Sequence, residues 1–82
     1  MSIVGSQIRM ARAALRWSVS ELSEQSRVSI STIKRMELEG ELTKVTEANA
    51  LAVLTTLENA GIEFIGAPDD RPGIRIGSPK PE

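Results

Sequence analysis

The sequence contains no cysteine and no histidine, and it has one tryptophan and one phenylalanine among its 82 residues. Without cysteine and histidine, a chain can form no disulfide, thiolate nucleophile or imidazole base, and it lacks the usual ligands of zinc. The many serines give no catalytic signal, because a nucleophilic serine needs a neighbouring base. We therefore expect a protein that is not an enzyme and that has no metal, cofactor or small-molecule site.

Long hydrophobic runs are also missing. No apolar stretch approaches the roughly 20 residues that a membrane helix needs, and the opening MSIVGS is too short and uncharged for a signal sequence. Hydrophobic residues at 40% and charged residues at 26% are ordinary values for a globular domain. We expect a soluble cytoplasmic protein with one small core and no membrane contact.

Charge is distributed unevenly along the chain. Residues 1–36 contain six Lys and Arg against two Glu, a net charge of +4, whereas residues 37–82 contain four Lys and Arg against nine acidic residues, a net charge of −5. A basic half joined to an acidic half is typical of a protein that binds nucleic acid at one end. Charges that merely solvate helix surfaces are the other explanation.

Two helices are predicted in the first third of the chain. The segment SQIRMARAALRW, residues 6–17, is rich in alanine and has apolar residues at helical spacing. Ser18 and Glu21 then form the pattern of a capping box, in which each side chain binds the free backbone N–H of the other. A second helix should therefore begin near Val19, with Leu22 pointing inward.

The segment RVSISTIKR, residues 27–35, fits two patterns. Its alternating β-branched residues are typical of a half-buried strand. Val28 and Ile33 also lie on one stripe of a turn and helix, and Ser29 is a favourable N-cap for that helix. A strand would need a hairpin partner nearby, and the flanking sequence offers none. We predict a turn followed by a helix over residues 30–38.

A fourth helix and a hairpin are predicted in the second half. TEANALAVLTTLENAG, residues 46–61, has apolar residues at steps of three before its final glycine, which favours a helix that buries Ala48, Leu51, Leu54 and Leu57. IEFIG and GIRIG then flank the loop sequence APDDRP, which predicts strands over Ile62–Ile65 and Ile74–Ile76. The last residues, 78–82, are predicted to be a disordered tail.

The segment SVSELSEQSRVSISTIKRMELEG resembles the helix-turn-helix of lambda-repressor-like, Cro-type regulators, also called the xenobiotic-response-element family. The similarity extends over residues 6–76, because AGIEFI and RPGIRI resemble the end of a bacterial subgroup with a C-terminal strand pair. It implies a mainly α fold, with a four-helix DNA-binding domain at 1–61 and a short β-hairpin at 62–77. The matching residues are Ser18, Glu21, Leu22, Val28, Ser29, Ser31, Thr32, Ile33, Met36 and Glu37.

The chain departs from this family at the turn. The family usually has alanine where Ser23 stands, a small apolar residue where Ser26 stands, and glycine where Arg27 stands. The glycine position requires a positive φ angle, which costs a residue with a side chain on the order of 1 kcal/mol.

The resemblance implies that the third helix enters the major groove of duplex DNA. With Ile33 pointing inward, Ser31 and Arg35 point outward, and Arg35 could donate two hydrogen bonds to a guanine. The predicted DNA-binding residues are Ser18, Arg27, Ser29, Ile30, Ser31, Thr32, Lys34 and Arg35. By the same resemblance, Arg12 and Glu37 should form a buried ion pair.

A single domain of this size reads few base pairs, so we expect a homodimer. The apolar residues of the hairpin are the predicted dimer surface, unless the hairpin folds back on its own helices: Ile62, Phe64, Ile65, Ile74 and Ile76. The leading interpretation is a sequence-specific transcriptional regulator that acts as a repressor. The alternative is an antitoxin or anti-repressor that uses a helix-turn-helix to bind a protein.

Overall fold

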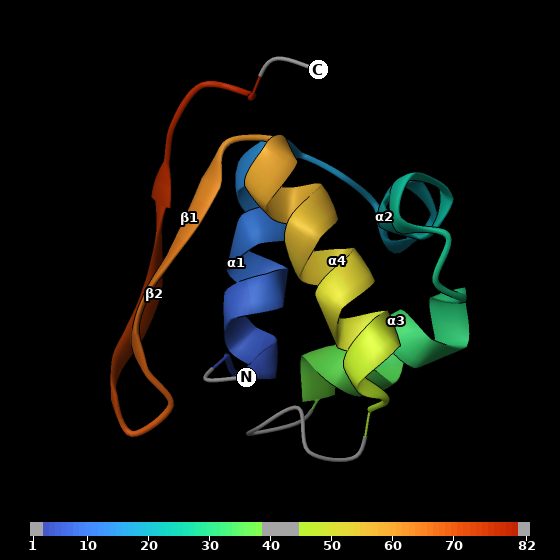
Figure 1. Ribbon diagram of the computed structural model, residues 1–82, viewed down its shortest axis with the longest axis horizontal. Helices are drawn as coiled ribbons and strands as arrows, with labels where there is room; N and C mark the ends of the chain where they lie inside the picture. Colours follow the sequence, from blue (N-terminus) through green and yellow to red (C-terminus); the bar gives the residue numbers. More distant parts are fainter. Residues whose placement is uncertain (1–2, 39–44, 81–82) are drawn as a thin grey trace.

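The computed structural model describes residues 3–38 and 45–80 and contains four helices followed by an antiparallel hairpin (Figure 1). The helices surround the core, and the hairpin lies along the side of α1 and α4, away from α2. α3 runs from the side of α2 to the start of α1, where Leu38 lines one pocket with Pro68 and Pro72 of the hairpin. The elements are α1 Gly5–Leu15, α2 Val19–Ser26, α3 Ile30–Leu38, α4 Glu47–Asn59, β1 Ile62–Ala67 and β2 Asp70–Ile76.

Hydroxyl groups cap the starts of α2, α3 and α4. The N–H of Glu21 donates to Ser18 Oγ at 3.0 Å, and the N–H of Ser18 donates to Glu21 Oε1 at 3.2 Å, so the predicted capping box is confirmed. Ser29 Oγ accepts from the N–H of Thr32 at 3.3 Å. Thr46 has the same role in α4. The segment 27–35 is therefore a turn followed by a helix, as predicted, and is not a strand.

The core is formed by apolar side chains from all four helices and from β1. The fully buried residues of this core lie on the helix faces that point toward one another. Trp17 packs against the core and is half-buried. Gly5 allows α1 to approach the end of α3, because a Cβ atom at that position would collide with the backbone of Met36 and Glu37. The large apolar side chains with almost no exposure are Ile8, Leu22, Ile33, Met36, Val53 and Leu57.

The predicted inward face of α4 is wrong in its first half. Leu54 and Leu57 are buried as expected, but Ala48 is exposed and 53% of Leu51 is accessible to solvent. A step of three residues turns about 300° around a helix, so a stripe that continues from 48 to 57 drifts by about half a turn. The buried stripe is instead Ala50, Val53, Leu54 and Leu57.

The hairpin folds back on the helices of its own chain. Ile62 pairs with Ile76, and Phe64 pairs with Ile74, as the predicted strands require, although both strands extend further toward the turn. Ile62 is buried, whereas Phe64 and Ile74 are half-buried and pack against the core. This is the arrangement that the sequence left open as the alternative, because α1 and α4 of the same chain contact the apolar face; a dimer through the hairpin stays a prediction. Of the predicted dimer residues, Ile65 is half-buried and Ile76 is exposed.

One fully buried amide fastens the hairpin to α1. The Nε2 group of Gln7 donates to the carbonyl oxygens of Ile65 and Gly73, at 3.0 and 2.8 Å, and its Oε1 atom accepts from the N–H of Val4 at 3.0 Å. Beyond the hairpin, the N–H of Lys80 donates to the carbonyl oxygen of Asn59 at 2.9 Å. The described part of the predicted tail, residues 78–80, therefore contacts the end of α4.

Candidate nucleic-acid interface

The turn between α2 and α3 is closed by two serine hydroxyls. Ser26 Oγ donates to the carbonyl oxygen of Leu22 at 2.7 Å and accepts from the N–H of Val28 at 3.3 Å. Ser23 Oγ donates to the carbonyl oxygen of Val28 at 2.6 Å. Both serines replace apolar residues of the family that the sequence resembles. Here they hold the turn through hydrogen bonds that a purely apolar residue could not make.

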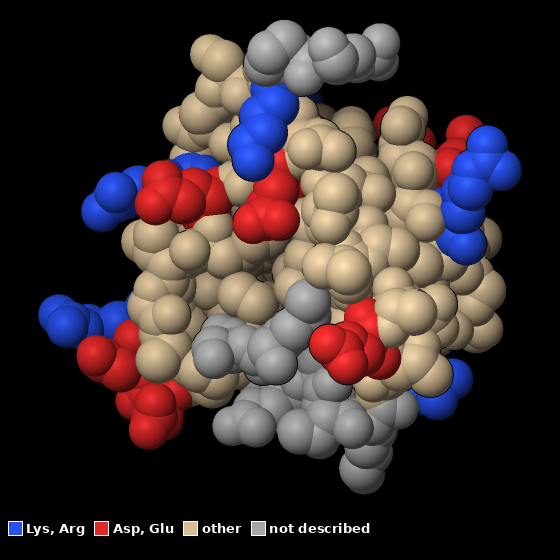
Figure 2. Space-filling view, in the orientation of Figure 1, with Lys and Arg blue, Asp and Glu red and all other residues tan. Residues whose placement is uncertain are grey.

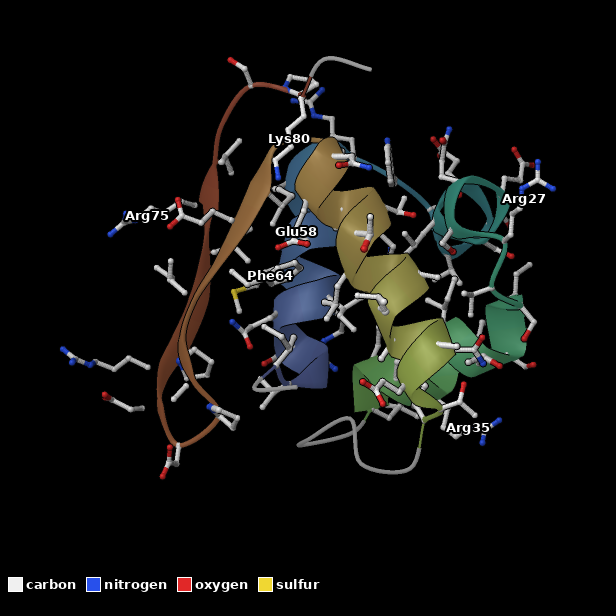
Figure 3. All side chains as sticks on the ribbon, in the orientation of Figure 1. Arg27, Arg35, Glu58, Phe64, Arg75 and Lys80 are labelled. Atoms are coloured by element: carbon white, nitrogen blue, oxygen red, sulfur yellow. The ribbon has the colours of Figure 1, made fainter. Side chains whose placement is uncertain are left out.

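Arg27 has the backbone conformation that the sequence predicted for its position. Its φ angle is 61°, in the left-handed region, and its N–H donates to the carbonyl oxygen of Ser23 at 2.8 Å as the C-cap of α2. A residue with a Cβ atom is strained there by on the order of 1 kcal/mol. The side chain is exposed and points away from the body of the molecule (Figure 3). The Arg27 guanidinium group therefore lies near the start of α3.

The outward face of α3 carries the residues that were predicted to face DNA. Ile33 and Met36 are fully buried, which turns the opposite side of the helix to solvent. The N-cap and the first turn present short hydroxyl side chains, and two cations, Lys34 and Arg35, follow them along the helix. The exposed residues of this face, with the N-cap, are Ser29, Ile30, Ser31, Lys34 and Arg35, and Thr32 is half-buried.

The cations of this region have no acidic partner among residues 3–38 and 45–80. The ion pairs found in these residues are Arg12 with Glu37, Arg71 with Asp70 and Arg75 with Glu63, and none of them involves Arg27, Lys34 or Arg35. Figure 3 shows Arg27 and Arg35 at the end of the molecule opposite the hairpin, with both side chains directed outward. The positive charge of this end is thus available to an anion.

The capping hydroxyls of the site already bind neighbouring groups. Ser29 Oγ donates to Thr32 Oγ1 at 2.8 Å and lies 3.3 Å from Ser31 Oγ. The backbone N–H of Ser18 is bound by Glu21, so it is not the free donor that a phosphate would use. The N–H groups of Val19 and Ser20 lie in the first turn of α2, where helix geometry supplies no acceptor.

A bidentate ion pair joins α1 to the last turn of α3. Arg12 Nε donates to Glu37 Oε2 at 2.9 Å, and its Nη2 donates to Oε1 at 3.0 Å, which confirms the predicted pair. The hydrogen bond to Glu37 raises the pKa of the Arg12 guanidinium above its ordinary value, although burial acts in the opposite direction. A further contact was not predicted: Arg9 Nη1 donates to the carbonyl oxygen of Glu37 at 2.9 Å, in the last turn of α3. Two arginines of α1 thus hold one end of α3.

The described ranges, 3–38 and 45–80, contain no group of three or more acidic residues, histidines or cysteines that could hold a metal ion. None of the helices in these ranges is long and apolar enough to cross a membrane. No protein-family model, curated protein or solved structure matches the chain. The function is therefore inferred from the residues and their geometry.

Proposed function

We propose that the protein is a sequence-specific DNA-binding transcriptional regulator of the helix-turn-helix type, with α3 as the helix that enters the major groove. The observation that carries this proposal is the exposed end formed by the turn and α3, where Arg27, Lys34 and Arg35 have no acidic partner in the described chain. The resemblance of residues 18–37 to Cro-type regulators supports the same role. The same proposal places the protein in the cytoplasm.

The side chains of α3 divide into two kinds of contact. Arg35 is long enough to reach a base edge and can donate two hydrogen bonds to O6 and N7 of guanine, which is the commonest specific contact in the major groove. Ser31 and Thr32 carry short hydroxyls that can bind a base or a phosphate. Ile30, which is 41% exposed, can contact a thymine methyl group. Base specificity is therefore assigned chiefly to Arg35.

The phosphate contacts are assigned to groups at the edge of the same surface. Arg27 and Lys34 supply positive charge on either side of the first turn of α3. The free N–H groups at the start of α2 point out of the helix, where its dipole also favours an anion. These contacts would set the orientation of the protein on the duplex but would not read its sequence.

The test compares Arg35→Ala with Arg75→Ala after the preferred DNA sequence has been selected from a random pool. Both substitutions remove one exposed arginine, but Arg75 lies on the hairpin, at the other end of the molecule (Figure 3). Arg35→Ala should weaken specific binding by about 1–3 kcal/mol and relax the preference at one base pair. Arg75→Ala should leave both quantities nearly unchanged.

The outcomes separate the proposal from its alternatives. An equal loss on selected and random DNA in the Arg35 variant would make Arg35 a phosphate contact. Binding through phosphates must also weaken steeply as salt rises. If the wild-type protein selects no sequence and shows no salt-dependent retention on duplex DNA, the regulator proposal fails and a protein-binding antitoxin or anti-repressor becomes the better explanation.

A further inference from the structure

The outer edge of β2 carries backbone groups that no strand of the described chain binds. Gly77 donates its N–H to the carbonyl oxygen of Gly61 at 2.7 Å, and in an antiparallel ladder hydrogen-bonded pairs alternate with pairs that are not bonded. Ile74 and Ile76 therefore fall in the second kind of pair, so their N–H and C=O groups point away from β1. Within residues 3–38 and 45–80 the sheet consists of β1 and β2, which leaves this edge without a partner strand.

The same edge is accessible along the side of the molecule, where Figure 1 shows β2 as the outermost element. Ile76 is 69% exposed, although it lies on the sheet face that packs against the helices. Pro72 lies on the same face of β2 and is half-buried. A strand edge with unpaired backbone groups and an exposed apolar side chain is a template for pairing with another strand.

We propose that two copies of this chain associate by pairing their β2 edges in antiparallel orientation, with Ile74 on the two-fold axis. Each Ile74 then exchanges two backbone hydrogen bonds with the partner's Ile74, and the N–H of Ile76 donates to the carbonyl oxygen of the partner's Pro72. Proline is tolerated at the end of this ladder because it only has to accept a hydrogen bond there. The proposal goes beyond DNA binding and does not depend on it, because the edge belongs to the hairpin and not to α3.

The arginines of β2 select this register. With Ile74 on the axis, Arg75 lies opposite the partner's Gly73. Arg71 likewise lies opposite the partner's Gly77. Sliding one strand by two residues would place Arg75 opposite its own copy in one direction and opposite the partner's Arg71 in the other. Like charges directly opposite each other destabilise a sheet, so both neighbouring registers are unfavourable.

The outer face of the hairpin presents balanced charge to a second copy. Arg75 Nη1 lies 3.7 Å from Glu63 Oε2, and Arg71 Nε lies 3.0 Å from Asp70 Oδ1. Figure 2 shows positive and negative side chains next to one another along this side of the molecule. Because each arginine has an acidic neighbour in its own chain, the approach of two hairpins is not opposed by a net charge.

The side chains on both faces of the hairpin fit the same pairing. A Cβ atom at Gly73 would meet only the side chain of Ile65, at 3.7 Å, so the outer face beside Gly73 has room for the aliphatic part of the partner's Arg75. On the other face, Ile76 lies beside the partner's Pro72, where its apolar surface is removed from water. A second copy thus complements the edge in backbone, charge and shape, and the symmetry supplies each contact twice.

The first experiment measures the oligomeric state of the full chain without DNA, by sedimentation over a wide range of concentrations. Ile76→Pro removes the outward N–H of an exposed residue, whereas the control Ile76→Val keeps that N–H and a branched side chain. Circular dichroism checks that both variants fold. We expect the wild-type protein and Ile76→Val to be dimers. The dissociation constant of the Ile76→Pro dimer should be at least about tenfold higher, because one hydrogen bond is lost on each side of the axis.

A wild-type protein that stays monomeric would overturn the proposal. A folded Ile76→Pro variant that dimerises as tightly as the wild type would do the same, and so would a monomeric Ile76→Val variant. Binding of the wild-type protein to DNA is measured separately. A dimer that binds no DNA would end the proposed function and leave this proposal standing, whereas a monomer that binds DNA would do the reverse.

A second experiment tests the register by cross-linking, and it decides the question if Ile76→Pro does not fold. The chain has no cysteine, so an introduced cysteine is the only thiol of its subunit. In the proposed register, residues 75 and 73 of the two copies form an unbonded pair with Cα atoms about 4.5 Å apart, which a disulfide can span, whereas diagonal neighbours are about 7–8 Å apart.

An equal mixture of the Arg75→Cys and Gly73→Cys proteins should therefore form a mixed disulfide under mild oxidation, and neither protein should form one alone. Mass spectrometry identifies the linked peptides. A disulfide in the Arg75→Cys protein alone or in the Gly73→Cys protein alone would overturn the proposed pairing, and so would a mixture that forms none.

Discussion

At the scale of single residues, the ion pair between Arg12 and Glu37 compensates the charge of a buried carboxylate. The side chain of Glu37 is only 8% exposed, and both of its oxygens accept from the guanidinium group. Arg12 keeps contact with solvent and also donates to the carbonyl oxygen of Trp17 at 3.1 Å. Removing the arginine would leave a carboxylate buried and alone, which is more costly than the pair is favourable. The pair therefore fixes where α3 lies against α1.

Arg27 combines backbone strain with a proposed role in binding, so one substitution should change the two properties in opposite directions. Arg27→Gly should raise the free energy of unfolding by about 0.5–1 kcal/mol, because glycine adopts the observed φ of 61° without strain. It should also weaken DNA binding, because a phosphate contact is lost. Thermal unfolding and a DNA titration measure the two effects.

Arg71→Gly is the matched control for that substitution. Arg71 also has a positive φ angle, 52°, but it lies in β2, and both side chains of its ion pair with Asp70 are exposed to solvent. This variant should gain stability in the same way and keep its affinity for DNA. If both variants lose DNA affinity equally, the loss reflects total charge and Arg27 has no special position.

At the scale of elements, the junction between α1 and the hairpin depends on the Gln7 amide. Gln7→Glu keeps an oxygen that can accept from Val4, but it places the second oxygen against the carbonyls of Ile65 and Gly73. Only a protonated carboxyl can donate there, so burial and these carbonyls should raise the pKa of the new glutamate in the folded state. The contribution of this glutamate to stability is then present below its pKa in the unfolded state. That contribution is lost as the pH rises through its pKa in the folded state.

The measurement for Gln7→Glu is thermal unfolding across the acidic to neutral range. We expect a variant close to wild type in acid that becomes less stable toward neutral pH, with a loss on the order of 1–3 kcal/mol for each buried group left unpaired. The wild-type protein, whose Gln7 cannot titrate, is the reference at each pH. A stability difference that does not change with pH would mean that the hairpin moves and exposes the side chain to water.

At the scale of the whole molecule, the sequence predicts local structure better than it predicts how the elements pack. Ser18 and Ser29 are caps whose partners lie three residues away, so the starts of α2 and α3 could be identified directly. The orientation of α4 could not, because Leu51 and Leu57 both fit an apolar repeat although they lie on different sides of the helix. The docking of the hairpin depends on Gln7, which contacts residues more than 50 positions away and looks in the sequence like any other polar residue.

The exposed face of α3 could be predicted for the same reason. Ser31 and Arg35 point outward because Ile33, in the same short helix, points inward, and one helix is enough to relate the three. The support behind that surface was predicted only in part. The Arg12 pair follows from the family resemblance. The hydroxyls of Ser23 and Ser26, in contrast, form hydrogen bonds with the backbone of Val28, and residue types alone do not identify such bonds.

The homodimer expected from the sequence makes a prediction about the spacing of its DNA site. Two α3 helices held by a fixed interface should bind half-sites whose centres are about one helical turn apart, on one side of the duplex. Inserting about five base pairs between the half-sites turns one of them to the opposite side. The wild-type protein should then lose most of its affinity, because it can hold only one half-site at a time. A gel-shift titration measures both affinities. Wild-type binding that is indifferent to the insertion would mean that each copy reads DNA alone.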